Sequence, residues 1–205
     1  MSWKPTLPPF RKFKKEVFIK AGMVSDFIYQ IGEYPQLRKP STAVPLEKIQ
    51  SAETQAKIAY LKACLLRYRE LIGYGRAITA VQVGIPEKFA VVYREDGLLV
   101  LINPKITKIS EKQYRYPEIC MSGNPIIAPV VRPAWIEFSY YDEQGKEQYW
   151  DTKDETSYGK MMNRVLQHEI DHMDGVITID LVTSPKELFL ESDPAFYDSA
   201  KFEKV

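Results

Sequence analysis

Two histidines constrain this chain more than any other feature of its sequence. They are the only two in 205 residues, and they lie four positions apart, at His168 and His172, with Glu169 directly after the first. Residues i and i+4 share one face of an α-helix, so both imidazoles can approach a single cation about 2 Å from each. This spacing is the H-E-x-x-H pattern of zinc hydrolases, in which the glutamate acts as a general base. The pair therefore predicts a helix that holds a metal ion, with a proton acceptor at its flank.

A third ligand would distinguish between classes of site, because a catalytic ion of this kind normally has three protein ligands and one open position. The longer protease pattern H-E-x-x-H-x-x-G-x-x-H is excluded, since its last position here is Thr178. A carboxylate after the helix, Glu187 or Glu191, would give a thermolysin-like site. The other candidate is Cys120, because a thiolate is a strong ligand for such an ion.

The composition favours one domain without a strongly charged partner. A chain of 205 residues with 45% hydrophobic residues can bury one core, so we expect a single domain over residues 1–205. The formal net charge is +1, so we expect neither nucleic acid nor a membrane as a partner. Two cysteines and the lack of an apolar run of roughly 18 residues indicate a cytoplasmic location, with organelle targeting left open by the basic N-terminal residues.

Hydrophobic periodicity predicts two helices and a set of strands. Apolar residues recur at helical spacing from about 51 to 72 and from about 157 to 173, and each stretch is followed by a glycine. Between about 87 and 152, β-branched and aromatic runs separated by turn signals predict largely antiparallel strands. We expect an arm over residues 1–27, a core over about 28–182 and a polar extension over 183–205. The predicted fold class is α+β.

Three motifs, in this order, resemble those of the peptide deformylase family. The stretch GRAITAVQ, residues 75–82, resembles Gly-x-Gly-Leu-Ala-Ala-x-Gln, and EICMS, residues 118–122, resembles Glu-Gly-Cys-Leu-Ser. The family's His-Glu-x-Asp-His is intact at residues 168–172. The likeness spans about residues 28–182 and implies an α+β fold in which antiparallel strands pack around a central metal-binding helix.

The resemblance implies a metal-dependent hydrolase that removes the formyl group from the N-terminal formylmethionine of nascent peptides and releases formate. It implies one divalent ion held by Cys120, His168 and His172. In this family the ion is commonly ferrous iron, with zinc, nickel or cobalt as alternatives. The implied partners are N-formylmethionyl peptides and, through nascent chains, the ribosome.

The resemblance also implies catalytic roles beside the ion. Glu169 would shuttle a proton, while the side-chain amide of Gln82 and the backbone N–H of Met121 would donate hydrogen bonds to the oxygen that gains negative charge. Each such donor is typically worth roughly 3 to 4 kcal/mol of barrier. The substrate pocket is expected to be lined by Gly75, Arg76, Ala77, Met161 and Val165.

The chain departs from the family pattern in its first two motifs. Ala77 replaces a glycine, Thr79 an alanine and Ile119 the glycine beside the cysteine. Arg76 stands where the family generally has an apolar side chain. Its guanidinium would narrow or cap the pocket, bind a substrate carboxylate, or extend into solvent.

Substrate anchoring also differs after the cysteine. Many family members carry a substrate-binding arginine seven residues later, where this chain has Ile127. Arg132 matches another arginine that recurs in the family.

Two other functions are compatible with these departures. One is a related amidase that accepts a different acyl group or peptide end. The other is a non-catalytic module that binds peptide termini or a protein partner. A pure binder has no need of Glu169, so an enzyme is favoured by the joint retention of Gln82, Cys120, His168, Glu169 and His172.

Overall fold

The computed structural model describes residue 19, residues 22–190 and residues 200–205. Most of the predicted arm over residues 1–27 and part of the predicted extension over 183–205 lie outside these residues.

The first predicted helix is present as α2, Ala52–Ile72. Ser51 caps its start by accepting a hydrogen bond from the Thr54 N–H. Gly73 ends it at φ 92°, a left-handed conformation that glycine adopts without steric cost. Its buried side chains, among them Leu61 and Leu65, join a core cluster with β-strand residues.

The second predicted helix is present as α3, Ser157–Met173. Gly175 follows it at φ 80°, and a Cβ there would lie 2.8 Å from the backbones of Arg38 and Lys39. The N–H of Ser41 donates to the carbonyl of Met173 at 2.7 Å. The end of α3 is therefore held against an early segment of the chain, which needs glycine at the point of closest approach.

The strands form two sheets in which every pairing is antiparallel. The five-stranded sheet has the order β1-β2-β3-β6-β7, with the bounds Ala77–Thr79, Phe89–Arg94, Gly97–Ile109, Ile136–Tyr141 and Glu147–Trp150. The four-stranded sheet has the order β8-β5-β4-β9, with the bounds Phe189–Leu190, Ile126–Pro133, Gln113–Ile119 and Glu203–Lys204.

Five predicted strand segments are present, as β2, β3, β5, β6 and β7. The sequence does not indicate β4, because its inward-facing positions are Tyr114, Tyr116 and Glu118 and it contains Pro117. A charged inward position and a proline both resemble a loop more than a strand.

Short 3₁₀ helices connect the larger elements: η1 Pro35–Arg38, η2 Leu46–Lys48, η3 Ala80–Val83, η4 Thr178–Leu181 and η5 Pro185–Glu187. Of these, η3 follows β1 directly and carries Gln82 into the interior.

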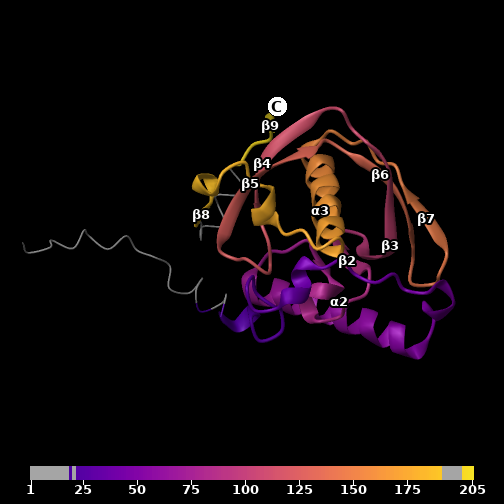
Figure 1. Ribbon diagram of the computed structural model, residues 1–205. Helices are drawn as coiled ribbons and strands as arrows, with labels where there is room; N and C mark the ends of the chain where they lie inside the picture. The colour runs from indigo at the N-terminus through magenta and orange to yellow at the C-terminus, as the bar shows by residue number, and fades with distance from the viewer. Residues whose placement is uncertain (1–18, 20–21, 191–199) are drawn as a thin grey trace, which may run out of the picture.

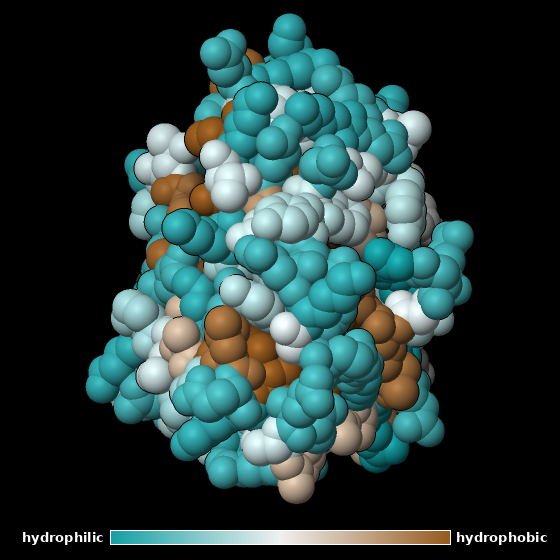
Figure 2. All heavy atoms as spheres, turned by 90° about the vertical axis from the view of Figure 1, so that its right-hand side faces the viewer, coloured by the Kyte–Doolittle hydropathy of each residue, from teal (hydrophilic) through white to brown (hydrophobic). Residues whose placement is uncertain are grey.

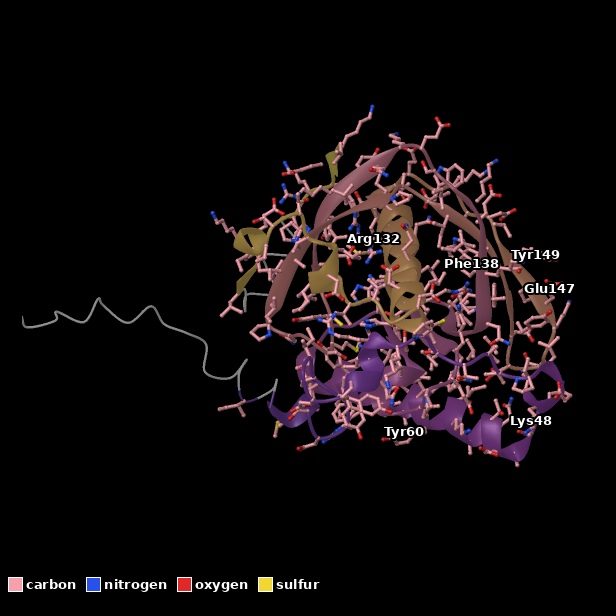
Figure 3. The ribbon with its side chains drawn as sticks, viewed as in Figure 1. Lys48, Tyr60, Arg132, Phe138, Glu147 and Tyr149 are labelled. Atoms are coloured by element: carbon pink, nitrogen blue, oxygen red, sulfur yellow. The ribbon has the colours of Figure 1, made fainter. Side chains whose placement is uncertain are left out.

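The helix α3 lies between the two sheets, and α2 lies beneath them in the view of Figure 1. One flank of α3 packs on the five-stranded sheet in an apolar cluster that includes Phe138 and Leu166. Its other flank faces the four-stranded sheet, which contributes Arg132, and Figure 3 shows Arg132 and Phe138 on opposite sides of the helix. The predicted α+β class, with antiparallel strands around a central helix, is confirmed.

None of the described helices is long and apolar enough to span a membrane. The face around β7 is mostly hydrophilic, with separate hydrophobic patches (Figure 2). Most buried apolar side chains of α2 and α3 lie in the two interior clusters.

Candidate metal centre and active site

Three predicted ligand atoms converge between β4 and α3. Cys120 directly follows β4, and His168 and His172 lie one turn apart on α3. The Cys120 Sγ lies 3.1 Å from the His172 Nε2, and the two histidine Nε2 atoms lie 3.2 Å apart. All three ligand atoms lie within 4.8 Å of one another, so this group could hold a metal ion.

The donor set fits an ion in geometry and in chemistry. Two ligands at 2.0 to 2.3 Å from a tetrahedral ion lie roughly 3.3 to 3.6 Å apart, close to the separations observed here. Burial opposes ionisation of the Cys120 thiol, but the charge of His172 and hydrogen bonds from both imidazoles outweigh it, so the thiol pKa lies well below its ordinary value. The thiolate is the form that binds a metal.

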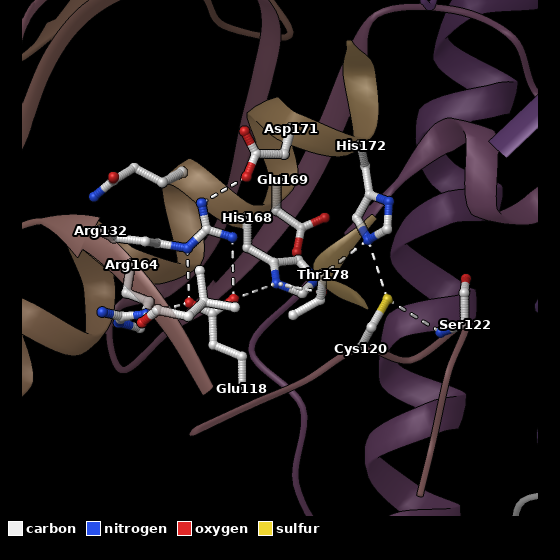
Figure 4. A network of polar contacts seen from close by, with 12 residues as sticks. Glu118, Cys120, Ser122, Arg132, Arg164, His168, Glu169, Asp171, His172 and Thr178 are labelled. Atoms are coloured by element: carbon white, nitrogen blue, oxygen red, sulfur yellow. Dashed lines mark hydrogen bonds and ion pairs between the residues drawn. The ribbon is translucent and has the colours of Figure 1, made fainter. Parts of the chain in front are cut away.

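Glu118 sets the orientation of the first histidine. It lies on β4, two residues before Cys120, and its Oε2 is 3.1 Å from the Nδ1 of His168 (Figure 4). The Thr178 hydroxyl lies 3.3 Å from the same nitrogen. A histidine that donates its Nδ1–H to a carboxylate presents a lone pair at Nε2, as metal-binding histidines generally do. Glu118 therefore favours the tautomer that a ligand needs.

Two arginines hold the Glu118 carboxylate in turn. Arg132 on β5 donates to both of its oxygens, at 2.7 and 3.0 Å, and Arg164 on α3 donates to Oε1. Arg132 also donates to Asp171 on α3 (Figure 4). Burial would raise the pKa of Glu118, but the charge of Arg132 and the hydrogen bonds from His168 and Arg132 hold it well below its ordinary value. Glu118 is thus ionised although it is almost fully buried.

Glu169 is buried beside this group and lines the adjoining cavity. The Thr79 hydroxyl donates to its Oε2 at 2.5 Å. Burial raises the pKa of Glu169 against the charges of His168 and His172 and the hydrogen bond from Thr79. A carboxyl whose pKa is raised toward the working pH is suited to accept a proton and return it.

Gln82 places its amide next to the ligand group. Its Oε1 accepts from the Thr79 N–H at 2.9 Å, so its Nε2 points to the Ser122 hydroxyl at 3.0 Å and to the Cys120 Sγ at 3.8 Å. Met121 follows Cys120, and its N–H makes no hydrogen bond within the described part of the chain. These are the two donors that the sequence motifs predict.

A cavity of about 700 Å³ opens beside the cluster, within the range of roughly 300 to 1,000 Å³ that is typical of small-ligand sites. The predicted residues that line it are Gly75, Arg76, Ala77, Gln82, Met121, Met161, Val165, His168 and Glu169. The structure therefore brings the predicted pocket and the predicted catalytic groups into one place, while their roles stay predictions.

The first motif keeps a glycine that the structure requires, and its two departures next to that glycine are accommodated in different ways. Gly75 has φ 125°, and a Cβ there would meet Tyr68 at 2.7 Å and Met121 at 2.8 Å, so this position requires glycine. Asn103 is the one non-glycine with positive φ in the described residues, so Ala77 adds no backbone strain. Arg76 lines the cavity, 5.8 Å from the Tyr158 ring, and has no ion pair within the described residues.

Among the described residues, the alternative ligand Glu187 and the candidate anchor positions Ile127 and Arg132 are engaged elsewhere. The Glu187 carboxylate pairs with Arg115 at 2.9 Å, and Glu191 lies outside the described residues. Ile127 is fully buried in β5, and the side chain of Arg132 is engaged by two carboxylates. Arg132 therefore supports the ligand group and is not available to anchor a substrate.

Sequence reasoning missed several residues of the cavity wall and an aromatic ring that packs on one of them. Arg164 and Tyr116 line the cavity, and the Phe202 ring stacks on Tyr116 with ring centres 4.4 Å apart. Tyr114 and Tyr116 at alternate positions were the one available signal, because they mark the inward face of β4.

The fold and the site together define a class: an α+β protein with a Cys-His-His group that could hold one metal ion, in which the cysteine and one histidine are buried, and a buried glutamate beside it. The family model of polypeptide deformylase matches residues 28–187. The chain belongs to the polypeptide deformylase family, as the motifs predicted.

Individual relatives agree with this assignment. A peptide deformylase of Treponema pallidum is 33% identical over 146 residues, which are 71% of this chain and 85% of that protein. One of Rhizobium meliloti is 37% identical over 117 residues, 55% of this chain and 64% of that protein. The matched stretch thus spans about three fifths of the length of several curated relatives.

Solved structures show the same fold. A peptide deformylase from Synechococcus elongatus in complex with actinonin superposes with a TM-score of 0.65 at 29% identity, covering 78% of this chain and 80% of that one. The enzyme from Thermotoga maritima gives a TM-score of 0.64 at 26% identity, covering 77% and 97%.

Proposed function

We propose that this protein is a metal-dependent peptide deformylase that removes the formyl group from the N-terminal formylmethionine of nascent peptides. The observation that carries the proposal is the convergence of Cys120, His168 and His172 beside buried Glu169, at the wall of a 700 Å³ cavity. Because nascent chains are the proposed substrate, the proposed place of action is the cytoplasm, where ribosomes release them.

The proposed ion is ferrous iron held by Cys120, His168 and His172. One sulfur and two imidazoles suit iron or zinc, with nickel and cobalt as substitutes, and metal availability often decides occupancy more than affinity does. A divalent ion at this site would activate water and polarise the formyl oxygen. Oxygen would oxidise ferrous iron or the thiolate, so the iron form is expected to lose activity in air.

The side chains of this protein would perform the proton transfers and stabilise charge. Glu169 accepts a proton from the attacking water and returns it to the amine of the departing peptide. The Gln82 amide and the Met121 N–H donate to the formyl oxygen as it gains negative charge. A formyl carbon carries only hydrogen, so a confined site admits it and excludes larger acyl groups.

Formate release from formyl-Met-Ala-Ser by anaerobically prepared, iron-loaded protein tests this function. We expect Glu169→Gln to keep its metal and to lose activity by about 10²- to 10⁴-fold, the usual contribution of general acid–base catalysis. Cys120→Ala is expected to lose the metal, while the control Glu187→Ala keeps it, because Glu187 pairs with Arg115. No formate from metal-replete protein would refute the proposal, and metal loss in Glu187→Ala alone would restore the thermolysin-like ligand set.

One observation favours a second candidate, an amidase with altered specificity. Arg76 lines the cavity and has no ion pair within the described residues, so it could bind a carboxylate of the substrate. We expect Arg76→Leu to favour methionine-containing substrates over acidic ones when kcat/KM values are compared across formyl peptides. Identical preferences in both proteins would show that Arg76 only faces solvent.

A further inference from the structure

Thr79 contacts both side chains that are proposed to act on the substrate. It is the last residue of β1 and directly precedes η3, and it is fully buried. Its backbone N–H donates to the Oε1 of Gln82 at 2.9 Å, and its hydroxyl donates to the Oε2 of Glu169 at 2.5 Å. One residue therefore joins β1, η3 and α3 at the ligand group.

The hydroxyl contact restricts Glu169. A hydroxyl has one hydrogen to donate, and the nearer of its two acceptors is the Glu169 Oε2, since the Glu169 carbonyl lies at 3.3 Å. With Oε2 engaged by Thr79, Oε1 is the oxygen left for proton transfer. Fixing a glutamate side chain restricts rotation about three bonds and costs conformational entropy. Because Thr79 fixes Glu169 before the reaction, this entropy cost does not add to the activation barrier.

The backbone contact restricts Gln82 in the same way. With Oε1 bound to the Thr79 N–H, the amide nitrogen must point in the opposite direction, where it reaches the Ser122 hydroxyl at 3.0 Å. The Cys120 Sγ lies 3.8 Å from that nitrogen. This contact needs only a backbone, whereas the contact to Glu169 needs a hydroxyl, which the alanine of the family motif lacks.

We propose that Thr79 is a positioning residue for the reaction, whose hydroxyl holds one oxygen of Glu169 so that the other faces the cavity. This inference rests on the proposed function. It makes the Thr79 departure from the family motif a working part of the site, and it assigns the hydroxyl, not the size of the side chain, as the group that matters.

Two substitutions separate the hydroxyl from the shape of the side chain. Thr79→Val keeps the branched shape and removes the hydroxyl, and Thr79→Ser keeps the hydroxyl. With iron-loaded protein and formyl-Met-Ala-Ser, we expect Thr79→Val to lower kcat by about 10- to 100-fold, part of the 10²- to 10⁴-fold typical of general acid–base catalysis, with little change in KM. Thr79→Ser should restore kcat to near that of the unsubstituted protein.

A buried threonine distant from the site provides the matched control. Thr54 lies on α2, is 5% exposed and contacts Ser51, so Thr54→Val should leave kcat and KM unchanged. Metal content and thermal unfolding are measured for every variant, because a smaller folded, metal-loaded fraction would also lower the apparent kcat without changing KM. The kcat of each variant is therefore expressed per folded, metal-loaded molecule. A double-mutant cycle of Thr79→Val with Glu169→Leu, in which each substitution removes the contact, measures its energy by chemical unfolding and needs no turnover.

Three outcomes decide the matter. Equal kcat in Thr79→Val and unsubstituted protein would overturn the positioning role while leaving the proposed function intact. A kcat in Thr79→Ser as low as in Thr79→Val would also overturn it, because the hydroxyl would then not be the active feature. No formate release from the unsubstituted, metal-loaded protein would refute the proposed function and this role together, which distinguishes that failure from the first two.

Discussion

The two flanks of α3 are both buried, but one is apolar and the other is ionic. Toward the five-stranded sheet the helix presents Met162, Leu166 and Ile170, at successive intervals of four, and they share a cluster with Phe138. Burying one such side chain stabilises a fold by about 1.5 to 3 kcal/mol. This flank therefore stabilises the fold through the apolar surface area that it buries.

The opposite flank presents Arg164, His168 and Asp171 to the four-stranded sheet, which supplies Glu118 and Arg132. Buried ion pairs add little net stability, because the loss of hydration offsets most of the attraction between the charges. Here the ion pairs orient the His168 ring. Their network ends at the Nδ1 of His168 and leaves its Nε2 facing the Cys120 sulfur and His172. The comparison shows that one flank of α3 stabilises the fold, while the other flank orients the metal ligand His168.

The largest expected effect comes from removing the carboxylate at the centre of the ionic flank. Glu118→Ala leaves the Arg132 and Arg164 guanidinium groups buried without their shared partner, which typically costs about 3 to 5 kcal/mol. It also frees the ring of His168, so metal affinity should fall by about 10- to 100-fold. Chemical unfolding and metal titration measure the two effects, and unchanged metal affinity would contradict the orienting role.

Local sequence patterns predict the apolar flank and do not predict the ionic one. α3 is recognisable because its apolar residues recur at helical spacing, a relationship within a few positions. Glu118 and Arg164 are 46 positions apart, and the residues around each of them do not indicate that the other is its ion-pair partner. For the same reason β4 escaped prediction, because the inward position taken by Glu118 interrupts its pattern.

The residues of the site also differ in whether local sequence patterns predict them. His168 and His172 were predicted as a pair because four positions on a helix are enough to place them together. Cys120 was a candidate third ligand from its thiol chemistry, beside Glu187 and Glu191. The choice among them needed the family motifs or the structure, since the fold brings Cys120 to the histidines from the end of β4. The bond from Thr79 to Glu169 joins residues 90 positions apart, so only the three-dimensional structure reveals it.

A substitution on the apolar flank should separate stability from metal binding. Leu166 is fully buried, so Leu166→Ala should lower the free energy of unfolding by about 2 to 5 kcal/mol through lost burial and the cavity that remains. Metal affinity of the folded protein should not change, because Leu166 packs in the apolar cluster with Phe138, on the flank of α3 that faces the five-stranded sheet. Leu46→Ala, at a position 53% exposed, is the control and should stay within about 0.5 kcal/mol. Weakened metal binding in Leu166→Ala would show that the two flanks are coupled.

The smallest effect is expected at Arg164, because Arg132 alone holds both oxygens of Glu118. Burial of the Arg164 guanidinium lowers its pKa, which reflects a cost of removing the charge from water. This cost offsets part of the stability that its hydrogen bonds to Glu118 and Val130 contribute, and Arg164→Met removes both. We expect a loss of about 1 to 2 kcal/mol in unfolding free energy and unchanged metal affinity. Arg132→Met, measured beside it, should lose metal affinity as Glu118→Ala does. Equal losses of metal affinity in the two arginine variants would mean that Glu118 needs both cations to orient His168, and the ionic flank would then act as one indivisible unit.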